Sequence, residues 1–329
     1  MIPSKAIVRT VAALAALALL PSCASAGGRD REDGPEGGST GPDPYATPMV
    51  TPTPVTPAPA APAPAGRPVE NGNGGLPLNP SNTTPDAPSV LGMATMGGNG
   101  QSTERYRKTD VTRDGQNYYL MANGWGPGFQ SQSISWSGTS FTVESMAGTQ
   151  GPNYEPASYP TVFCGLYSDS QSRACGLPAA LDTMTSLRTG WSWRANNNIG
   201  EYNAAYDIWL GTSAARSSFS GYLMVWFREP PGQQPAGRLT TSDVTVEHVP
   251  GTWDIWTGAV GGRPIINWVR AEGEDTPSME FDILDFVRDA EARQLTVPGS
   301  HVLSVAVGFE IWKGPIQDLE SVDFYVDVE

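Results

Sequence analysis

Apolar and polar residues alternate along about the C-terminal two thirds of the chain, and the clearest example is the stretch 304–312. Every second residue of this stretch is large and apolar: Val305, Val307, Phe309 and Ile311. Because successive side chains of a strand point to opposite faces, this spacing predicts a strand with one face in the core. The other face would form the floor of a groove, with the carboxylate of Glu310 beside the ring of Trp312.

Similar short segments follow one another from about residue 95 to the end of the chain, with Gly, Pro, Asn and Ser between them. We expect strands at 118–121, 132–136, 141–145, 190–194, 204–210, 222–227, 244–248, 252–257, 264–269, 302–312 and 322–328. Many short strands separated by turn residues are typical of an antiparallel sandwich or jelly roll. The pattern therefore predicts an all-β domain covering residues 91–329.

One segment of this domain has helical spacing. The apolar residues that recur at this spacing are Met279, Ile283, Phe286, Val287 and Ala290. Thr276 is a favourable N-cap residue and Pro277 a favourable first residue of a helix. We therefore expect one helix that begins at Pro277 and packs on the convex back of a sheet.

The first quarter of the chain does not have the composition of a folded domain. Residues 1–26 combine an early positive charge with the short apolar run 11–20, which predicts a signal peptide. The end of this signal peptide allows two interpretations: cleavage after Ala26 with ordinary secretion, or lipoprotein-type cleavage before Cys23, which is then acylated. Residues 27–90 hold half of the chain's 30 prolines, which indicates an extended linker.

Charge and cysteine content narrow the class of protein. The net charge of −14 argues against nucleic acid and anionic membrane surfaces as partners. Cys164 and Cys175 are the only cysteines besides Cys23, and in an exported protein their spacing favours a disulfide. The two histidines, His248 and His301, show no metal-ligand spacing, so we expect no metal and no cofactor.

Several motifs, taken in order, resemble glycoside hydrolase family 12, whose members are mostly endo-β-1,4-glucanases and xyloglucanases. The matching segments are Asn123-Gly124-Trp125-Gly126, Tyr159-Pro160 with Cys164-Gly165 and Cys175, Asn203-Ala204-Ala205-Tyr206-Asp207-Ile208-Trp209, Leu223-Met224-Val225-Trp226-Phe227, Gln234-Pro235-Ala236-Gly237 and Gly308-Phe309-Glu310-Ile311-Trp312. The resemblance covers nearly the whole domain. It implies a jelly-roll sandwich of two curved antiparallel sheets with one packed α-helix, and a cleft across the concave sheet.

The resemblance also implies a retaining mechanism with two carboxylates about 5–5.5 Å apart. Glu310 falls on the position of the acid/base, and Asp207 on that of a supporting carboxylate which holds the nucleophile. Trp125 falls on a tryptophan that stacks on a glucose. The other positions expected to bind substrate are Asn123, Met224, Trp226, Pro235 and Trp312, although Trp226 and Trp312 are also compatible with packing at the sheet edge.

The nucleophile position departs from the family. When the chain is aligned through Leu223-Met224-Val225-Trp226 without a gap, the family's glutamate becomes Tyr222. Three interpretations follow: the cleft binds glucan without hydrolysing it, another nucleophile operates, or the substrate has changed. In the second case Tyr222 itself attacks with Asp207 as its base, or Asp207 activates a water for inversion. The ring of Tyr222 could also have no chemical role and only fill the space that the family's glutamate occupies.

We therefore expect a secreted or cell-surface protein that recognises a β-1,4-glucan such as cellulose or xyloglucan and acts as a monomer. The family reaction is endo-hydrolysis in polysaccharide catabolism, and the missing nucleophile places it in doubt here. The alternatives are an active endoglucanase with a non-standard nucleophile, a non-catalytic glucan-binding lipoprotein of the cell surface, and a purely structural envelope protein.

Overall fold

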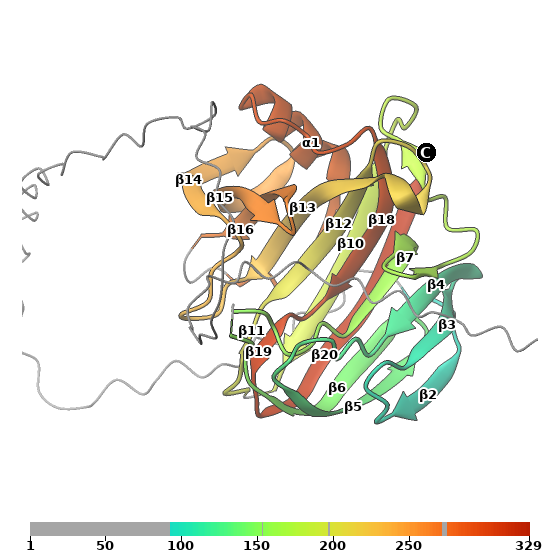
Figure 1. Ribbon diagram of the computed structural model, residues 1–329. Coiled ribbons are helices and arrows are strands. Elements are labelled where there is room, and N and C mark those ends of the chain that lie inside the picture. The colour runs from blue at the N-terminus through green and yellow to red at the C-terminus, as the bar shows by residue number, and fades with distance from the viewer. Residues whose placement is uncertain (1–92, 153, 197, 272–274) are drawn as a thin grey trace, which may run out of the picture. The chain divides into compact units, whose positions relative to one another are not determined.

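The computed structural model describes residues 93–329, apart from 153, 197 and 272–274, and these residues form a β-sandwich (Figure 1). The larger sheet has 12 strands, and ten of them follow one another in a single spatial order. These are β1 (Met96–Gly97), β3 (Lys108–Arg113), β4 (Gln116–Met121), β7 (Thr161–Tyr167), β18 (His301–Gly308), β12 (Ala204–Gly211), β13 (Phe219–Arg228), β16 (Arg263–Arg270), β15 (Val249–Val260) and β14 (Arg238–Val246). The short strands β8 (Ser170–Gln171) and β9 (Ala179–Ala180) pair with β7 and β18.

The smaller sheet has six strands and covers one face of the larger one. In spatial order they are β17 (Ser278–Asp282), β10 (Leu187–Ala195), β20 (Ile316–Val328), β6 (Ser140–Gly148), β5 (Phe129–Ser137) and β2 (Asn99–Ser102). A two-stranded ribbon of β11 (Glu201–Tyr202) and β19 (Ile311–Lys313) and a short 3₁₀-helix, η1 (Arg216–Ser218), complete the sandwich with one α-helix, α1 (Ile283–Ala292). The predicted jelly-roll class is confirmed, although one strand pair, β13 with β16, is parallel.

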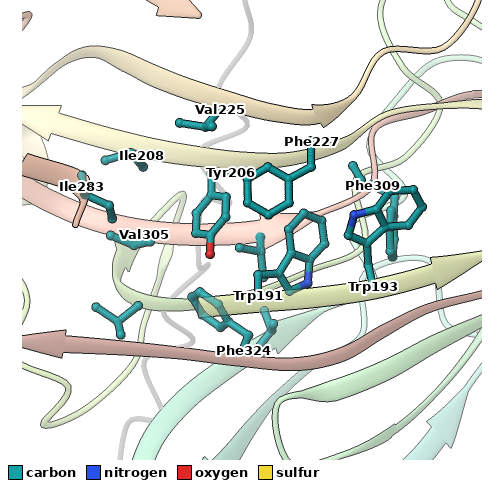
Figure 2. Close-up of a cluster of buried hydrophobic side chains, with 14 of the residues drawn as sticks. Trp191, Trp193, Tyr206, Ile208, Val225, Phe227, Ile283, Val305, Phe309 and Phe324 are labelled. Carbon is teal, nitrogen blue, oxygen red and sulfur yellow. The ribbon is translucent and has the colours of Figure 1, made fainter. Parts of the chain in front are cut away.

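The core between the sheets is rich in aromatic side chains. Figure 2 shows Trp191 of the smaller sheet facing Tyr206 and Phe227 of the larger one. The ring centroids of Trp191 and Phe227 lie 5.6 Å apart, and those of Trp191 and Phe309 lie 5.7 Å apart. The face of β18 that alternation assigned to the core, including Phe309 just beyond its end, is fully buried there. Large rings contribute much of the apolar area that the sandwich removes from water.

Most predicted strands are present, and the differences have identifiable causes. Strand β7 was not predicted because all seven of its residues are buried, so both of its faces carry apolar or small side chains and no alternation is visible. The expected strand 244–248 ends at Val246, and His248 lies in the turn before β15 with a φ of 63°.

The predicted start of the helix was wrong. Residues Ser278–Asp282 form β17 and pair with β10, so Met279 belongs to a strand. The helix begins at Ile283 with Asp282 as its N-cap, whose carboxylate accepts a hydrogen bond from Leu284 N at 2.9 Å. Thr276 donates its backbone N–H to Phe227 O instead of capping a helix. Pairing along the free edge of β10 therefore outweighed the local helix-start signal.

The helix packs on the side of β15 and β16 that faces the core. Phe286 meets Trp253 of β15 at 5.4 Å and Trp268 of β16 at 5.1 Å between ring centroids. Within the described residues, no helix combines the length and the apolar character needed to cross a bilayer.

Candidate active-site groove

The face of the larger sheet that points away from the core carries the candidate site. Along β13, Leu223, Val225 and Phe227 belong to the main core, whereas Tyr222, Met224 and Trp226 belong to a separate cluster on the opposite face. A second separate cluster includes Phe163 of β7, Tyr167 and Ala306. We call the face formed by these two clusters and the carboxyl groups between them the groove face.

Strand register sets the order of side chains on the groove face. Asp207 of β12 pairs with Ala306 on one side and with Met224 on the other, and Met224 pairs in turn with Asn267 of β16. Tyr222 pairs with Trp209, which follows Asp207 by two residues on β12, so Tyr222 lies towards the C-terminal end of β12. Glu310 lies beyond the end of β18 in the other direction, so Asp207 stands between Tyr222 and Glu310.

Glu310 is held by Asn203, the residue just before β12. The Asn203 Nδ2 donates to Glu310 Oε2 at 2.5 Å, and the backbone N–H of Glu310 donates to Asn203 Oδ1 at 2.8 Å. Burial raises the pKa of Glu310 to about 8, the negative charge of Asp207 adds to this rise, and the hydrogen bond from Asn203 opposes it. Glu310 is therefore protonated at neutral pH, which is the state that a general acid requires.

Asp207 is buried, and two hydrogen bonds hold one of its oxygens. Its Oδ2 accepts from the Tyr167 hydroxyl at 2.9 Å and from Trp209 Nε1 at 3.0 Å. Its Oδ1 is buried and has no hydrogen-bond partner in the described part of the chain. Burial raises the pKa of Asp207 to about 6, and the bonds from Trp209 and Tyr167 limit the rise. Asp207 therefore ionises before Glu310 as the pH increases.

Tyr222 stands among other aromatic rings. It meets Phe219 edge-on at 4.9 Å and Trp209 edge-on at 6.0 Å between ring centroids. Burial raises the pKa of the Tyr222 phenol to about 12, and the negative charge of Asp207 adds to the rise, while Arg263 opposes it. The phenol is therefore fully protonated at neutral pH.

The predicted binding residues fall into an exposed and a buried group. Trp125 is 38% exposed in the loop after β4, and Asn123 in the same loop has a φ of 46°. Trp226 and Trp312 are buried against each other, with ring centroids 5.8 Å apart, and Trp312 Nε1 donates to Tyr154 O at 2.9 Å. For Trp226 and Trp312, this arrangement agrees with the alternative that the sequence left open, namely that the two rings pack against the protein itself.

Met224 and Pro235 are buried as well. Met224 lies in the middle of the groove face beside Asp207, whereas Pro235 lies in the loop that follows β13. The next residue of that loop, Ala236, accepts a hydrogen bond from Asn267 Nδ2 at 3.2 Å. For these residues, contact with a ligand stays a prediction.

Comparison with known proteins decides the family. The sequence profile described as Glycosyl hydrolase family 12 matches residues 116–329. This chain belongs to glycoside hydrolase family 12. Endoglucanase S of Pectobacterium parmentieri is 26% identical over 229 residues, which cover 64% of this chain and 82% of that protein. The xyloglucan-specific endo-beta-1,4-glucanase A of Aspergillus niger is 25% identical over 150 residues, which cover 45% of this chain and 61% of that protein.

A solved structure agrees with the assignment to family 12. Endoglucanase cel12A from Rhodothermus marinus superposes with a TM-score of 0.61 at 29% identity, over 70% of this chain and 99% of that one. The match extends over nearly the whole of that protein, so the sandwich is the complete family 12 fold.

Three residues of the site escaped the sequence analysis. Asn203 was quoted as part of a motif but received no role, although it contacts Glu310 through both its side chain and its backbone. Tyr167 and Trp209 hold Asp207, and Tyr167 is forty residues away from it in sequence. Trp209 carried a signal, because it alternates with Asp207 on one strand, whereas Tyr167 carried none.

The pair of cysteines in the family 12 fold is joined, as expected. Cys164 of β7 and Cys175 form a disulfide with Cα atoms 5.8 Å apart. The bridge closes the loop that follows β7, the strand that carries Tyr167 at its end. In the part of the chain that the structure describes, no group of three or more His, Cys, Asp or Glu residues is arranged to hold a metal ion.

Proposed function

We propose that this family 12 protein binds β-1,4-glucan chains outside the cell and hydrolyses them weakly or not at all. The family membership supports a glucan ligand, since the relatives that match the chain are named endoglucanases and xyloglucan-specific glucanases. No cofactor takes part in this function. We infer a monomer, attached through an acylated Cys23 or freely secreted; the disulfide supports an oxidising compartment.

One observation carries the proposal: the groove face of β13 bears no carboxyl group. Its residues there are Tyr222, Met224 and Trp226. A retaining glycosidase needs one carboxylate to attack the sugar and a second carboxyl group to protonate the leaving oxygen. Glu310 is in the protonated state that suits the second role, and the first role has no carboxylate at the position where the family alignment expects one.

Tyr222 is a poor substitute for that carboxylate. A phenol whose pKa is raised to about 12 carries almost no phenolate at neutral pH. A phenol attacks well only when a base removes its proton or its pKa is lowered. Tyr222 therefore supports loss of hydrolysis better than a changed nucleophile.

A second candidate function rests on the free oxygen of Asp207. Its Oδ1 has no hydrogen-bond partner within the described residues, so it is able to accept a proton from a water. With Glu310 as the acid and Asp207 as the base, hydrolysis would proceed in a single displacement with inversion. We rank this candidate below binding without turnover, because the Asp207 Oδ1 is buried, so a water would first have to enter the floor of the groove to reach it.

The test measures binding and turnover separately on the full chain. Calorimetry with cellohexaose and with xyloglucan oligosaccharides is expected to show binding, and release of reducing ends from the polymers is expected to stay near background. Strong release of reducing ends that disappears in Asp207→Asn and survives in Tyr222→Phe would point to Asp207 as a relocated base. Inversion of configuration in the first product, read by proton NMR, would then establish the inverting enzyme instead. Absence of binding to every β-1,4-glucan would remove the proposed function.

A further inference from the structure

One arginine stands on the groove face near Tyr222. Arg263 is the first residue of β16 and is exposed, and alternation along the strand places it on the same face as Ile265, which belongs to the Tyr222 cluster. Strands β13 and β16 are parallel, and Tyr222 pairs with Ile265. Arg263 therefore lies one two-residue step, about 7 Å, beyond the Tyr222 row along the strands.

Phe219, the first residue of β13, holds the guanidinium of Arg263. Arg263 Nε donates to Phe219 O at 3.3 Å, and Arg263 Cζ lies 4.8 Å from the centroid of the Phe219 ring. That ring stacks on Trp209, with centroids 4.2 Å apart and an angle of 17° between the ring planes. Because a backbone carbonyl and a stacked ring fix the guanidinium, it loses little conformational freedom when a ligand binds.

The outer edge of this guanidinium has no anionic partner. Within the described residues, Arg263 forms no ion pair, and its two Nη atoms have no hydrogen-bond partner. Arg113, by contrast, donates from Nε and Nη2 to the carboxylate of Asp323. The Nη groups of Arg263 therefore offer a planar pair of donors, which is the geometry that a carboxylate ligand accepts.

Tyr222 makes the same place suitable for a negative charge. Burial and the charge of Asp207 raise the pKa of the Tyr222 phenol, and Arg263 is close enough for its positive charge to oppose them. The phenol stays protonated at neutral pH, so it offers a neutral O–H donor near the guanidinium. A glutamate, which the family has at this position, would repel a carboxylate instead. The charge that opposes an anion here is that of Asp207, one of whose oxygens already accepts two hydrogen bonds.

We propose that Arg263 and Tyr222 form a subsite for a carboxylate carried on the side of a β-1,4-glucan chain, such as a glucosyl unit oxidised at C6. The inference rests on the proposed function. A chain that crosses the strands has this site at its side, where the C6 groups of a β-1,4-linked chain project. The net charge of −14 disfavours a densely charged polymer, but its field is screened beyond about 8 Å at physiological salt, whereas Arg263 acts at contact.

The first experiment compares two ligands by calorimetry in about 0.15 M salt. They are cellohexaose and the same oligosaccharide with one C6 carboxylate, and the full chain carries Glu310→Gln so that no ligand is consumed. We expect the carboxylated ligand to bind about three- to tenfold more tightly, as for one charge-assisted contact at a partly exposed site. Equal affinities of this parent for the two ligands would overturn the subsite.

Arg263→Gln is expected to remove most of this preference. Arg263→Lys keeps the charge without the planar fork and is expected to keep part of it. The matched control is Arg188→Gln, which removes an exposed arginine from β10 of the smaller sheet and is expected to keep the whole preference. If Arg188→Gln and Arg263→Gln reduce the preference equally, the overall charge of the protein is responsible and the subsite is overturned.

The second experiment tests the charge at position 222 with two variants of the same shape. Tyr222→Gln places a neutral amide with N–H donors there, and we expect it to retain a preference for the carboxylated ligand. Tyr222→Glu places a carboxylate there, and we expect it to reverse the preference through like-charge repulsion. Equal preferences of the two variants would overturn the part assigned to position 222.

Two further readouts separate the failures. Thermal melting of each variant confirms folding. If the parent chain binds neither ligand, the proposed function fails and the subsite fails with it. If the parent binds cellohexaose and shows no preference for the carboxylated form, only the subsite fails.

Discussion

The two carboxyl groups of the groove differ in what holds them. Glu310 receives one side-chain amide, from Asn203, whereas Asp207 receives a phenol and an indole N–H, from Tyr167 and Trp209. Burial raises both pKa values, and the bonds to Asp207 keep its pKa the lower of the two. At neutral pH, Glu310 is therefore protonated and Asp207 is ionised. The position on β13 where the family has its nucleophile, however, holds the phenol of Tyr222.

The most direct test of that position is Tyr222→Glu. Asp207 lies close enough to raise the pKa of Tyr222 through its charge, so a glutamate at 222 would stand near both Asp207 and the groove floor. We expect detectable hydrolysis of a soluble β-1,4-glucan, with retention of configuration at the new end, from a parent that releases almost none. The stereochemistry is read by proton NMR of the first product.

Tyr222→Phe is the matched control, because it keeps the ring and adds no acid. It is expected to behave like the parent in both binding and turnover. If Tyr222→Glu folds, binds glucan and still releases no product, Tyr222 does not occupy the nucleophile position.

Glu310 also makes stability depend on pH. Its folded-state pKa is raised from 4.5 to about 8, so the folded protein binds the proton more tightly than the unfolded chain does. Its contribution is therefore present below about pH 4.5 and is lost as the pH rises towards 8. We expect Glu310→Gln to raise the Tm more at pH 9 than at pH 5, by about 2–4 °C for each kcal/mol recovered.

The control for this measurement is Glu104→Gln, which removes an exposed carboxylate whose side chain is 71% accessible. Its effect on the Tm is expected to be small and similar at both pH values. A Glu310→Gln variant whose gain in Tm is the same at pH 5 and pH 9 would contradict the raised pKa.

At the level of elements, the join between β17 and α1 depends on one side chain. The carboxylate of Asp282 accepts from Leu284 N at 2.9 Å, which caps the helix, and from Leu187 N at 3.1 Å, which ties the cap to β10. The last residue of an edge strand therefore also begins the helix. This explains why the helix starts at Ile283 and not at the proline earlier in the segment.

Asp282→Ala removes both of these acceptors. We expect it to lower the free energy of unfolding by about 1–2 kcal/mol, since an N-cap is lost and a second N–H loses its partner. Denaturant unfolding of the purified chain measures the change. Asp282→Asn keeps an oxygen acceptor and is expected to lose less; equal midpoints for Asp282→Ala and the parent would show that the cap is not needed.

At the level of the whole molecule, the two faces of the larger sheet differ: one is covered and the other carries the candidate site. The smaller sheet and the helix cover one face of the larger sheet, and the groove face carries the carboxyl groups and the ring clusters. The net charge of −14 keeps the chain away from anionic surfaces, and neutral glucans are insensitive to it.

The mode of export is testable at this scale, although Cys23 lies outside the described residues. We expect the mature chain to begin at Cys23, to carry an acyl modification and to partition with detergent, because acyl chains contribute about 0.8 kcal/mol for each buried CH₂. Mass spectrometry of the native N-terminus and phase partitioning measure this. Cys23→Ser is expected to move the protein to the aqueous phase, and a wild-type chain that begins at Gly27 in that phase would decide for ordinary secretion.

The sequence by itself determined the class of fold and two carboxyl residues of the site. Strand alternation is local, because it requires only that one face be buried, and the motifs around Asp207 and Glu310 are contiguous. The tertiary structure alone decided the contacts between distant segments: Asn203 with Glu310 across 107 residues, Tyr167 with Asp207, and Arg105 with the Trp125 loop. It also decided that residues 278–282 pair as a strand and that β7 is buried on both faces. The physical reason is that periodicity reports which side of an element is buried, whereas strand pairing and loop packing determine which polar groups meet.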